Sequence, residues 1–163
     1  MRSAAVLALA LLWSPAAGAQ PVFDRLSGSG PNSDPCLARD YDVAHLRRNP
    51  RQRVTHFHLV RERVDVPDEN GPQRFTVRIG FRLRGDRDLY ATHAVCISSG
   101  AAADCTGEGD TGAFRLTLSG GAVRLAVERL EVEGARGSSP DLARSDDRVF
   151  LLQPGRAAAC AAR

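Results

Sequence analysis

Residues 74–84, RFTVRIGFRLR, are the stretch of sequence that decides the fold. Every odd position from Phe75 to Leu83 carries an apolar side chain, whereas four of the even positions carry arginine. Successive side chains of a strand point to opposite faces, so this stretch predicts a strand with one apolar and one basic face. A strand of this kind is typical of an antiparallel sheet that buries one face only.

The same two-residue period returns along the rest of the chain. It predicts further strands at 53–66, 89–98, 113–118, 123–133 and 148–153, with a phase change near Val60 that indicates a bulge. Residues 99–112 are rich in glycine and predict a loop. Because no helices alternate with these strands, we expect a mainly β fold. The architecture is an antiparallel β-meander of about six strands, forming a small sandwich or barrel.

The beginning of the chain predicts export. Residues 1–19 combine Arg2, an apolar run and the small residues before Gln20, which is the pattern of a cleaved signal peptide. No transmembrane segment is expected after its removal, and the protein is expected to be periplasmic or secreted. Residues 20–35 predict a flexible lead-in, and 36–163 a single domain that opens with one short helix over 36–48.

Four cysteines, Cys36, Cys96, Cys105 and Cys160, predict two disulfides in an oxidising compartment. Three pairings are possible. Cys96 and Cys105 are nine residues apart and are expected to form a local clamp. Cys36 and Cys160 would then tie the start of the domain to its end, which could stabilise the fold by up to about 4–5 kcal/mol.

Composition and motifs argue against two classes of function, nucleic-acid binding and catalysis. All 22 basic residues are arginine, but the net charge of +3 is too small to indicate a nucleic-acid partner. The sequence contains neither a Gly-x-Ser-x-Gly elbow nor a glycine-rich phosphate loop, and its cysteines are expected to be oxidised. We therefore expect no enzymatic activity.

Two sets of side chains are candidate binding residues. His56 and His58 are two apart on a strand and share a face, so with His93 they could bind zinc or copper, although no resident cofactor is expected. The arginines of the strand 74–84 could bind an anionic ligand through their guanidinium groups, and they are Arg78, Arg82 and Arg84. The alternative for these arginines is a solvated face that pairs with acidic residues on other strands.

Cys36, the segment YDVAHL at 41–46 and Pro50 resemble a stretch found in small exported alphaproteobacterial proteins of unknown function. The resemblance covers about 20 residues and implies an envelope protein with a helix-turn before a β domain. We expect a non-enzymatic binding or accessory module that recognises an envelope protein or an anionic ligand. The alternative is a carrier of copper, zinc or a small ligand that uses His56 and His58.

Overall fold

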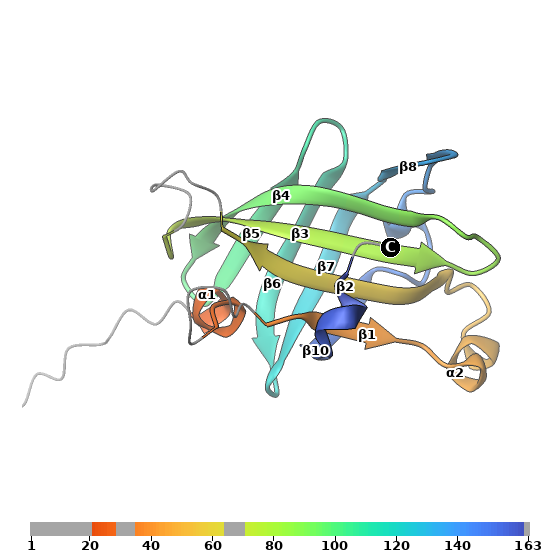
Figure 1. Cartoon of the computed structure of the whole chain (residues 1–163), viewed down its shortest axis with the longest axis horizontal. Helices are drawn as coiled ribbons and strands as arrows, with labels where there is room; N and C mark the ends of the chain where they lie inside the picture. Colours follow the sequence, from red (N-terminus) through yellow and green to blue (C-terminus); the bar gives the residue numbers. More distant parts are fainter. Residues whose placement is uncertain (1–20, 29–34, 64–70, 162–163) are drawn as a thin grey trace, which may run out of the picture.

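The computed structural model describes residues 21–28, 35–63 and 71–161 (Figure 1). In this part of the chain, eight antiparallel strands close into a barrel in the order β1-β10-β7-β6-β5-β4-β3-β2. Their bounds are β1 Leu37–Asp40, β2 Val54–Glu62, β3 Arg74–Leu83, β4 Leu89–Ser99, β5 Ala102–Gly107, β6 Gly112–Ser119, β7 Ala122–Leu130 and β10 Val149–Pro154. The mainly β antiparallel fold is confirmed, and its closed form is a barrel.

Strands β2 to β7 form the meander, because each pairs with the next strand along the chain. A small hairpin of β8 (Glu133–Gly134) and β9 (Gly137–Ser138) and the 3₁₀ turn η2 (Leu142–Arg144) lead into β10. Strand β10 pairs with β7 on one side and β1 on the other, and β1 also pairs with β2. The two ends of the domain therefore meet at β1.

Strand β1 replaces the first part of the helix that we expected over 36–48. Residues 37–40 pair with β2, and Leu37 and Ala38 also pair with β10, which closes the barrel. The helix itself is α2 (Val43–Arg48), and Asp42 caps it by accepting a hydrogen bond from the backbone N–H of His45. The strand pairing that closes the barrel therefore determines the structure of residues 37–40, although their sequence is compatible with a helix.

Two other expectations for this strand pattern are wrong. The segment expected as a loop at 99–112 contains β5, in which Cys105 lies directly opposite Cys96 of β4. The irregularity of β2 lies between Val54 and His56, where the register with β3 shifts, and not at Val60.

The expected flexible lead-in contains a helix, α1 (Pro21–Leu26), that packs against the barrel. Val22 and Leu26 are buried, and the ring of Phe23 meets Phe75 edge-on with centroids 5.4 Å apart. Arg61 of β2 lies over the Phe23 ring and donates a hydrogen bond to Ser27. The expected signal peptide, 1–19, lies outside the described residues.

Aromatic side chains fill the interior of the barrel. Phe57 stacks on Phe150 at 4.3 Å and on Phe81 at 5.8 Å, and Phe81 stacks on Tyr90. These rings leave at most 5% of their surface exposed. The inside of the barrel is thus a packed core, as expected for eight strands with large inward side chains. No helix in the described part of the chain has the length and apolar character needed to cross a bilayer.

Both expected disulfides are present. Cys96–Cys105 joins neighbouring strands, and Cys36–Cys160 joins the start of β1 to the last turn of the chain across 124 residues of sequence. No cysteine is free.

Candidate binding groove beside the C-terminal strap

Residues 155–161, here called the C-terminal strap, cross the outer face of strands β1 and β2 (Figure 1). The strap contains the short turn η3 (Ala157–Ala159) and ends beside the Cys36–Cys160 disulfide. At its start, the backbone N–H of Gly155 donates to the carbonyl of Cys36 at 2.8 Å. The strap is therefore tied at both of its ends to Cys36, the residue before β1.

His56 of β2 holds the middle of the strap. Its Nε2 lies 3.0 Å from the carbonyl oxygen of Ala159 and 3.1 Å from Nδ1 of His58. Its Nδ1 lies 2.7 Å from Oδ1 of Asp40 on the neighbouring strand β1. The Asp40 side chain is largely exposed, whereas His56 is mostly covered by the strap.

Arg78 of β3 makes the second polar contact to the strap. It donates from Nη2 to the carbonyl of Cys160 at 3.1 Å, and its Nε lies 3.3 Å from Oε1 of Glu62. The other carboxylate oxygen of Glu62 contacts Nδ1 of His93 at 2.5 Å. His93 is therefore engaged by Glu62, while His56 is engaged by Asp40.

The structure pairs His56 with His58 but does not add His93 to them. Within residues 21–28, 35–63 and 71–161, no three His, Cys, Asp or Glu side chains are grouped in a way that could hold a metal ion. Arg78 and Arg82 flank His58 on β3, and their positive charge opposes the binding of a cation there.

His58 is completely buried, although it lies on the outer face of the barrel. Its ring covers Gly80 of β3, where a Cβ atom would lie 2.5 Å from Cε1 and 2.7 Å from Nε2. Only glycine leaves room for the ring at this position. Burial, and after it the neighbouring His56, Arg78 and Arg82, together lower the pKa of His58 to about 4. His58 is therefore neutral at neutral pH.

One atom of the His58 ring is left without a partner. Nε2 is buried and has no hydrogen-bond partner among residues 21–28, 35–63 and 71–161. A buried polar atom without a partner costs about 1–3 kcal/mol, so it is a point at which a bound group would contribute favourably.

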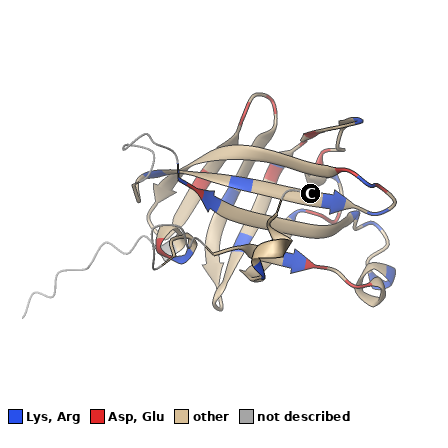
Figure 2. Cartoon of the chain, in the orientation of Figure 1, with Lys and Arg blue, Asp and Glu red and all other residues tan. Residues whose placement is uncertain are grey.

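A groove of about 770 Å³ runs beside the strap, with His58 among its lining residues. We call it the strap groove, and its walls come from β1, β2, the last part of β3 and β10, the first residue of β4 and the strap itself. Arg82 and Arg156 bring positive charge to it from β3 and the strap, whereas the guanidinium of Arg39, which also belongs to its lining, lies over the ring of Tyr41. Among the described lining residues, Asp40 is the single carboxylate. Figure 2 shows the basic positions on β1 and β3 that border it. The groove thus has the charge and donors for an anionic group.

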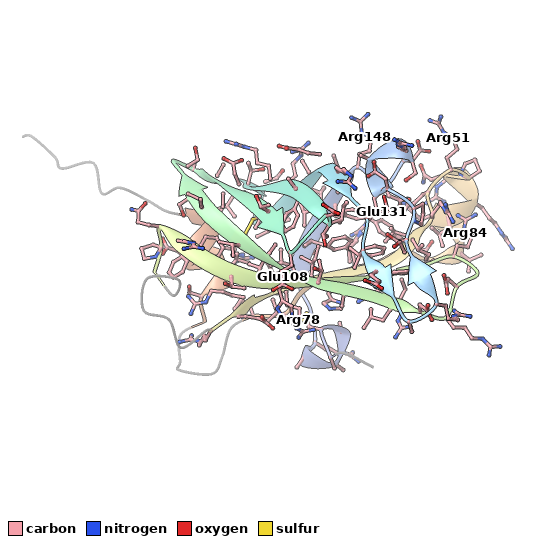
Figure 3. All side chains as sticks on the ribbon, turned by 90° about the horizontal axis from the view of Figure 1, so that it is seen from above. Arg51, Arg78, Arg84, Glu108, Glu131 and Arg148 are labelled. Atoms are coloured by element: carbon pink, nitrogen blue, oxygen red, sulfur yellow. A yellow bond between two sulfur atoms is a disulfide. The ribbon has the colours of Figure 1, made fainter. Side chains whose placement is uncertain are left out.

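The three arginines predicted as a ligand surface share the outer face of β3 but not one site. Figure 3 shows Arg78 beside the strap and Arg84 at the end of the barrel where α2 lies. Arg84 donates to the carbonyl of Leu46 in α2, and Arg78 is held beneath the strap. Arg82 is the member of the set that lines the groove.

Sequence reasoning missed Asp40, Arg39 and Arg156 as site residues. Asp40 and Arg39 were assigned to a helix, and Arg156 lies in a segment of small residues without periodicity. A signal for Arg156 was present in the expected Cys36–Cys160 pairing, which brings the end of the chain to β1.

Comparison with known proteins supplies no assignment, since no family model, no curated protein and no solved structure matches the chain. The two disulfides indicate a protein that works outside the reducing cytoplasm. The function must therefore be argued from the groove itself.

Proposed function

We propose that the protein is an exported, non-enzymatic binding module whose strap groove takes an anionic ligand. The observation that carries the proposal is the presence of Arg82 and Arg156 on one concave surface with a neutral histidine among its walls. Asp40, the one carboxylate of the groove, already contacts His56. Guanidinium groups bind carboxylate, phosphate and sulfate with paired hydrogen bonds, which favours ligands of these classes.

The start of the sequence supports export to the periplasm or the outside of the cell. A positive first turn, an apolar run and small residues at 17–19 match a signal peptide, and two disulfides suit the oxidising compartment beyond it.

Binding is favoured over catalysis by the side chains that line the groove. Asp40 and His56 form a carboxylate–imidazole pair, but the groove lining contains no serine, threonine or cysteine that such a pair could activate. The strap also occupies His56 through the carbonyl of Ala159, so this ring is engaged in holding the structure.

The test is a calorimetric titration of the oxidised protein, without residues 1–19, with a sulfated oligosaccharide, a dicarboxylate and a neutral oligosaccharide. We expect the two anions to bind and the neutral sugar not to bind. Arg82→Gln and Arg156→Gln should each weaken binding about tenfold, because each removes a charged hydrogen-bond donor. Arg144→Gln is the matched control, since Arg144 is exposed and lies outside the groove.

Binding that is equally strong for Arg82→Gln, Arg156→Gln and Arg144→Gln would locate the anion elsewhere. Absence of binding for both anions at low salt would contradict the proposal as a whole.

A second candidate function is the transport of zinc or copper. The specific observation in its favour is the 3.1 Å separation of His56 Nε2 and His58 Nδ1, which is close to the spacing of two nitrogen ligands on one metal ion. Asp40 would support it, because metal-binding histidines commonly donate their second N–H to a carboxylate. Titration with Zn²⁺ and Cu²⁺ decides it: uptake by the parent protein and its loss in His56→Gln would favour the carrier over the anion-binding module.

A further inference from the structure

A second pocket, of about 580 Å³, lies between two links of the chain. One link, 49–53, joins α2 to β2, and the other, 145–148, joins η2 to β10. We call this pocket the link pocket. Arginine supplies four of the eight described residues that line it, and they are Arg51, Arg53, Arg144 and Arg148. No described residue lines both the link pocket and the strap groove, so the two are separate sites.

The side chain of Asp147, which is buried, holds the two links together. Its carboxylate accepts hydrogen bonds from the backbone N–H of Arg53 at 2.8 Å and of Val54 at 3.0 Å. The hydroxyl of Ser145 donates to the same carboxylate at 2.8 Å. Asp147 therefore fixes the backbone of Arg53 beside the link that carries Arg148, and three donors already share its negative charge.

Two of the four arginines are paired with acids. Arg51 contacts both carboxylate oxygens of Asp146, with Nη2–Oδ1 at 2.8 Å and Nε–Oδ2 at 3.3 Å. Arg144 Nε lies 3.7 Å from Oδ2 of Asp141, and the Arg144 side chain is 87% exposed. Because Asp146 is the single carboxylate among the described lining residues, Arg51 already offsets the negative charge of the lining.

Arg53 and Arg148 are the two arginines of the lining without an acidic partner. In the described part of the chain, neither guanidinium makes a hydrogen bond or an ion pair, and both residues are exposed. Val54 is completely buried, so Arg53, next to it, points away from the interior of the barrel. Figure 3 shows Arg51 and Arg148 pointing outward along one edge of the molecule. Each link therefore brings one uncompensated positive charge to the pocket.

Guanidinium groups on two different links favour a tetrahedral oxyanion. Each guanidinium is a planar group with five N–H donors and binds two oxygens at once. A phosphate or sulfate group presents its oxygens in several directions, so it can accept hydrogen bonds from both links. A carboxylate has only two oxygens in one plane, which suits a single guanidinium better.

We propose that the link pocket is a second anion site of this protein, in which Arg53 and Arg148 together bind a phosphate or sulfate group. The proposal goes beyond the strap groove, because it uses none of the residues that line the groove. A free ion and the head group of a phosphatidate lipid carry the same chemistry, and the experiments separate these two sources.

The first experiment resolves the two sites in one sample. The side-chain Nε–Hε signals of the arginines are followed by ¹⁵N–¹H correlation at pH 6.5 and low salt, while inorganic phosphate is added to the oxidised protein without residues 1–19. We expect the signals of Arg53 and Arg148 to shift along one saturable curve. A response confined to Arg82 and Arg156 would overturn the inference and leave the strap groove standing. A response confined to Arg53 and Arg148 would support the link pocket and contradict the groove for this ion.

The second experiment compares variants of the same protein by calorimetric titration with phosphate and with sulfate. Arg53→Gln and Arg148→Gln should each weaken binding about tenfold, because each removes a charged donor. Arg53→Lys keeps the charge but loses the planar pair of donors, so it should recover only part of the affinity. Arg144→Gln is the matched control for net charge and should change binding less than about twofold. Equal losses in all three glutamine variants would overturn the site, because net charge alone would then explain the binding.

The third experiment identifies the source of the group. Co-sedimentation is measured with vesicles of phosphatidylcholine alone and of phosphatidylcholine with phosphatidate. Binding that requires phosphatidate and is lost in Arg53→Gln and Arg148→Gln would support a lipid head group as the ligand. Binding of phosphate without binding to vesicles would support a free ion. Failure of all arginine signals to respond to phosphate, with vesicle binding unchanged in both variants, would contradict the link pocket as a site for either source.

Discussion

The two faces of strand β2 are buried to a similar degree for different reasons. Phe57 and Leu59 point into the barrel and have no exposed surface, and His58, between them on the opposite face, has none either. The inner side chains are covered by rings from other strands, such as Phe150 and Phe81. The outer histidine is covered by the strap and by the close approach of Gly80.

The two faces therefore depend on different parts of the molecule. The inner face is buried by the barrel itself, whereas the outer face is buried only while the strap is attached. Inward burial follows from closing the sheet, so it persists whenever the barrel forms. Outward burial requires the strap, which is held by one disulfide and by contacts of His56 and Arg78 to its carbonyls. The strap should therefore open at a lower free energy than the barrel.

The largest effect on the free energy of unfolding is expected from removal of the Cys36–Cys160 disulfide, which attaches the strap. Cys36→Ser with Cys160→Ser should lower the free energy of unfolding by about 4–5 kcal/mol, because the disulfide closes most of the chain into one loop in the unfolded state. Guanidinium denaturation measures the loss. Hydrogen exchange should show faster exchange in the strap than in β2, which distinguishes strap release from barrel opening.

The second disulfide is the control for this prediction. Cys96→Ser with Cys105→Ser removes a loop of nine residues, for which the same entropy argument gives about 2–3 kcal/mol. Two outcomes would contradict the prediction: an equal loss in the free energy of unfolding for the two disulfides, or slow hydrogen exchange in the strap after Cys36–Cys160 is removed. Either would mean that contacts with the barrel wall hold the strap without the disulfide.

Truncation of the inner face should cost slightly less than loss of the strap disulfide. Phe57→Ala removes a ring that stacks on Phe150 and Phe81, with an expected loss of about 4 kcal/mol in the free energy of unfolding. Leu151→Ala on the outer side of β10 is the control, because Leu151 is 45% exposed and its truncation should cost less than about 1 kcal/mol. A small effect of Phe57→Ala would mean that the interior can repack around the missing ring.

The outer face should add an acid sensitivity that the inner face lacks. In the folded protein the pKa of His58 is about 4, below its ordinary value of 6.5, so between these values the unfolded chain binds a proton that the folded chain does not. His58 therefore contributes stability that is present above pH 6.5 and is lost as the pH falls to about 4. The loss should amount to about 3 kcal/mol.

Thermal or chemical denaturation across this pH range measures the effect. The carboxylates also titrate in this range, so the quantity of interest is the difference between the parent and His58→Phe. Leu151→Ala, which removes no titratable group, should retain the parent's slope. An identical pH dependence in His58→Phe would show that His58 is solvated in the folded protein.

Much of the inner face could be predicted from the sequence, since alternation in 74–84 and 53–66 needs only the local period. Strand β1 could not, because its four residues become a strand only through pairing with β2 and β10, and the local pattern is compatible with a helix. Strand β5 was missed for a related reason. Its sequence AADCTG has few β-branched residues, and it becomes a strand through pairing with β4 and β6.

The candidate site was predictable only in part. The spacing of His56 and His58 correctly placed both rings on one face. Their partners come from distant segments, with Ala159 lying 103 residues beyond His56 in the sequence, and no local pattern reports such a contact. His93, which the sequence offered as a possible third metal ligand, contacts Glu62 instead, and the pair lies between Asp40, the strap and two arginines.

The smallest expected effect isolates the contact between the outer ring and the barrel wall. Gly80→Ala places a methyl group 2.5 Å from Cε1 of His58, so the ring must shift or tilt. Overpacking of this size should lower the free energy of unfolding by about 2 kcal/mol. Gly71→Ala is the matched control, because a Cβ at Gly71 meets nothing within 4 Å, and its effect should stay within about 0.5 kcal/mol.

The double variant Gly80→Ala/His58→Ser decides whether the ring is the cause. Removing the ring makes room for the methyl group, so Gly80→Ala should cost almost nothing in a chain that already carries His58→Ser. The coupling between the two positions should then be close to the whole effect of the single substitution. Additive losses would mean that alanine at this position disturbs β3 itself, and that the outer face of the barrel tolerates the ring of His58 without requiring glycine beneath it.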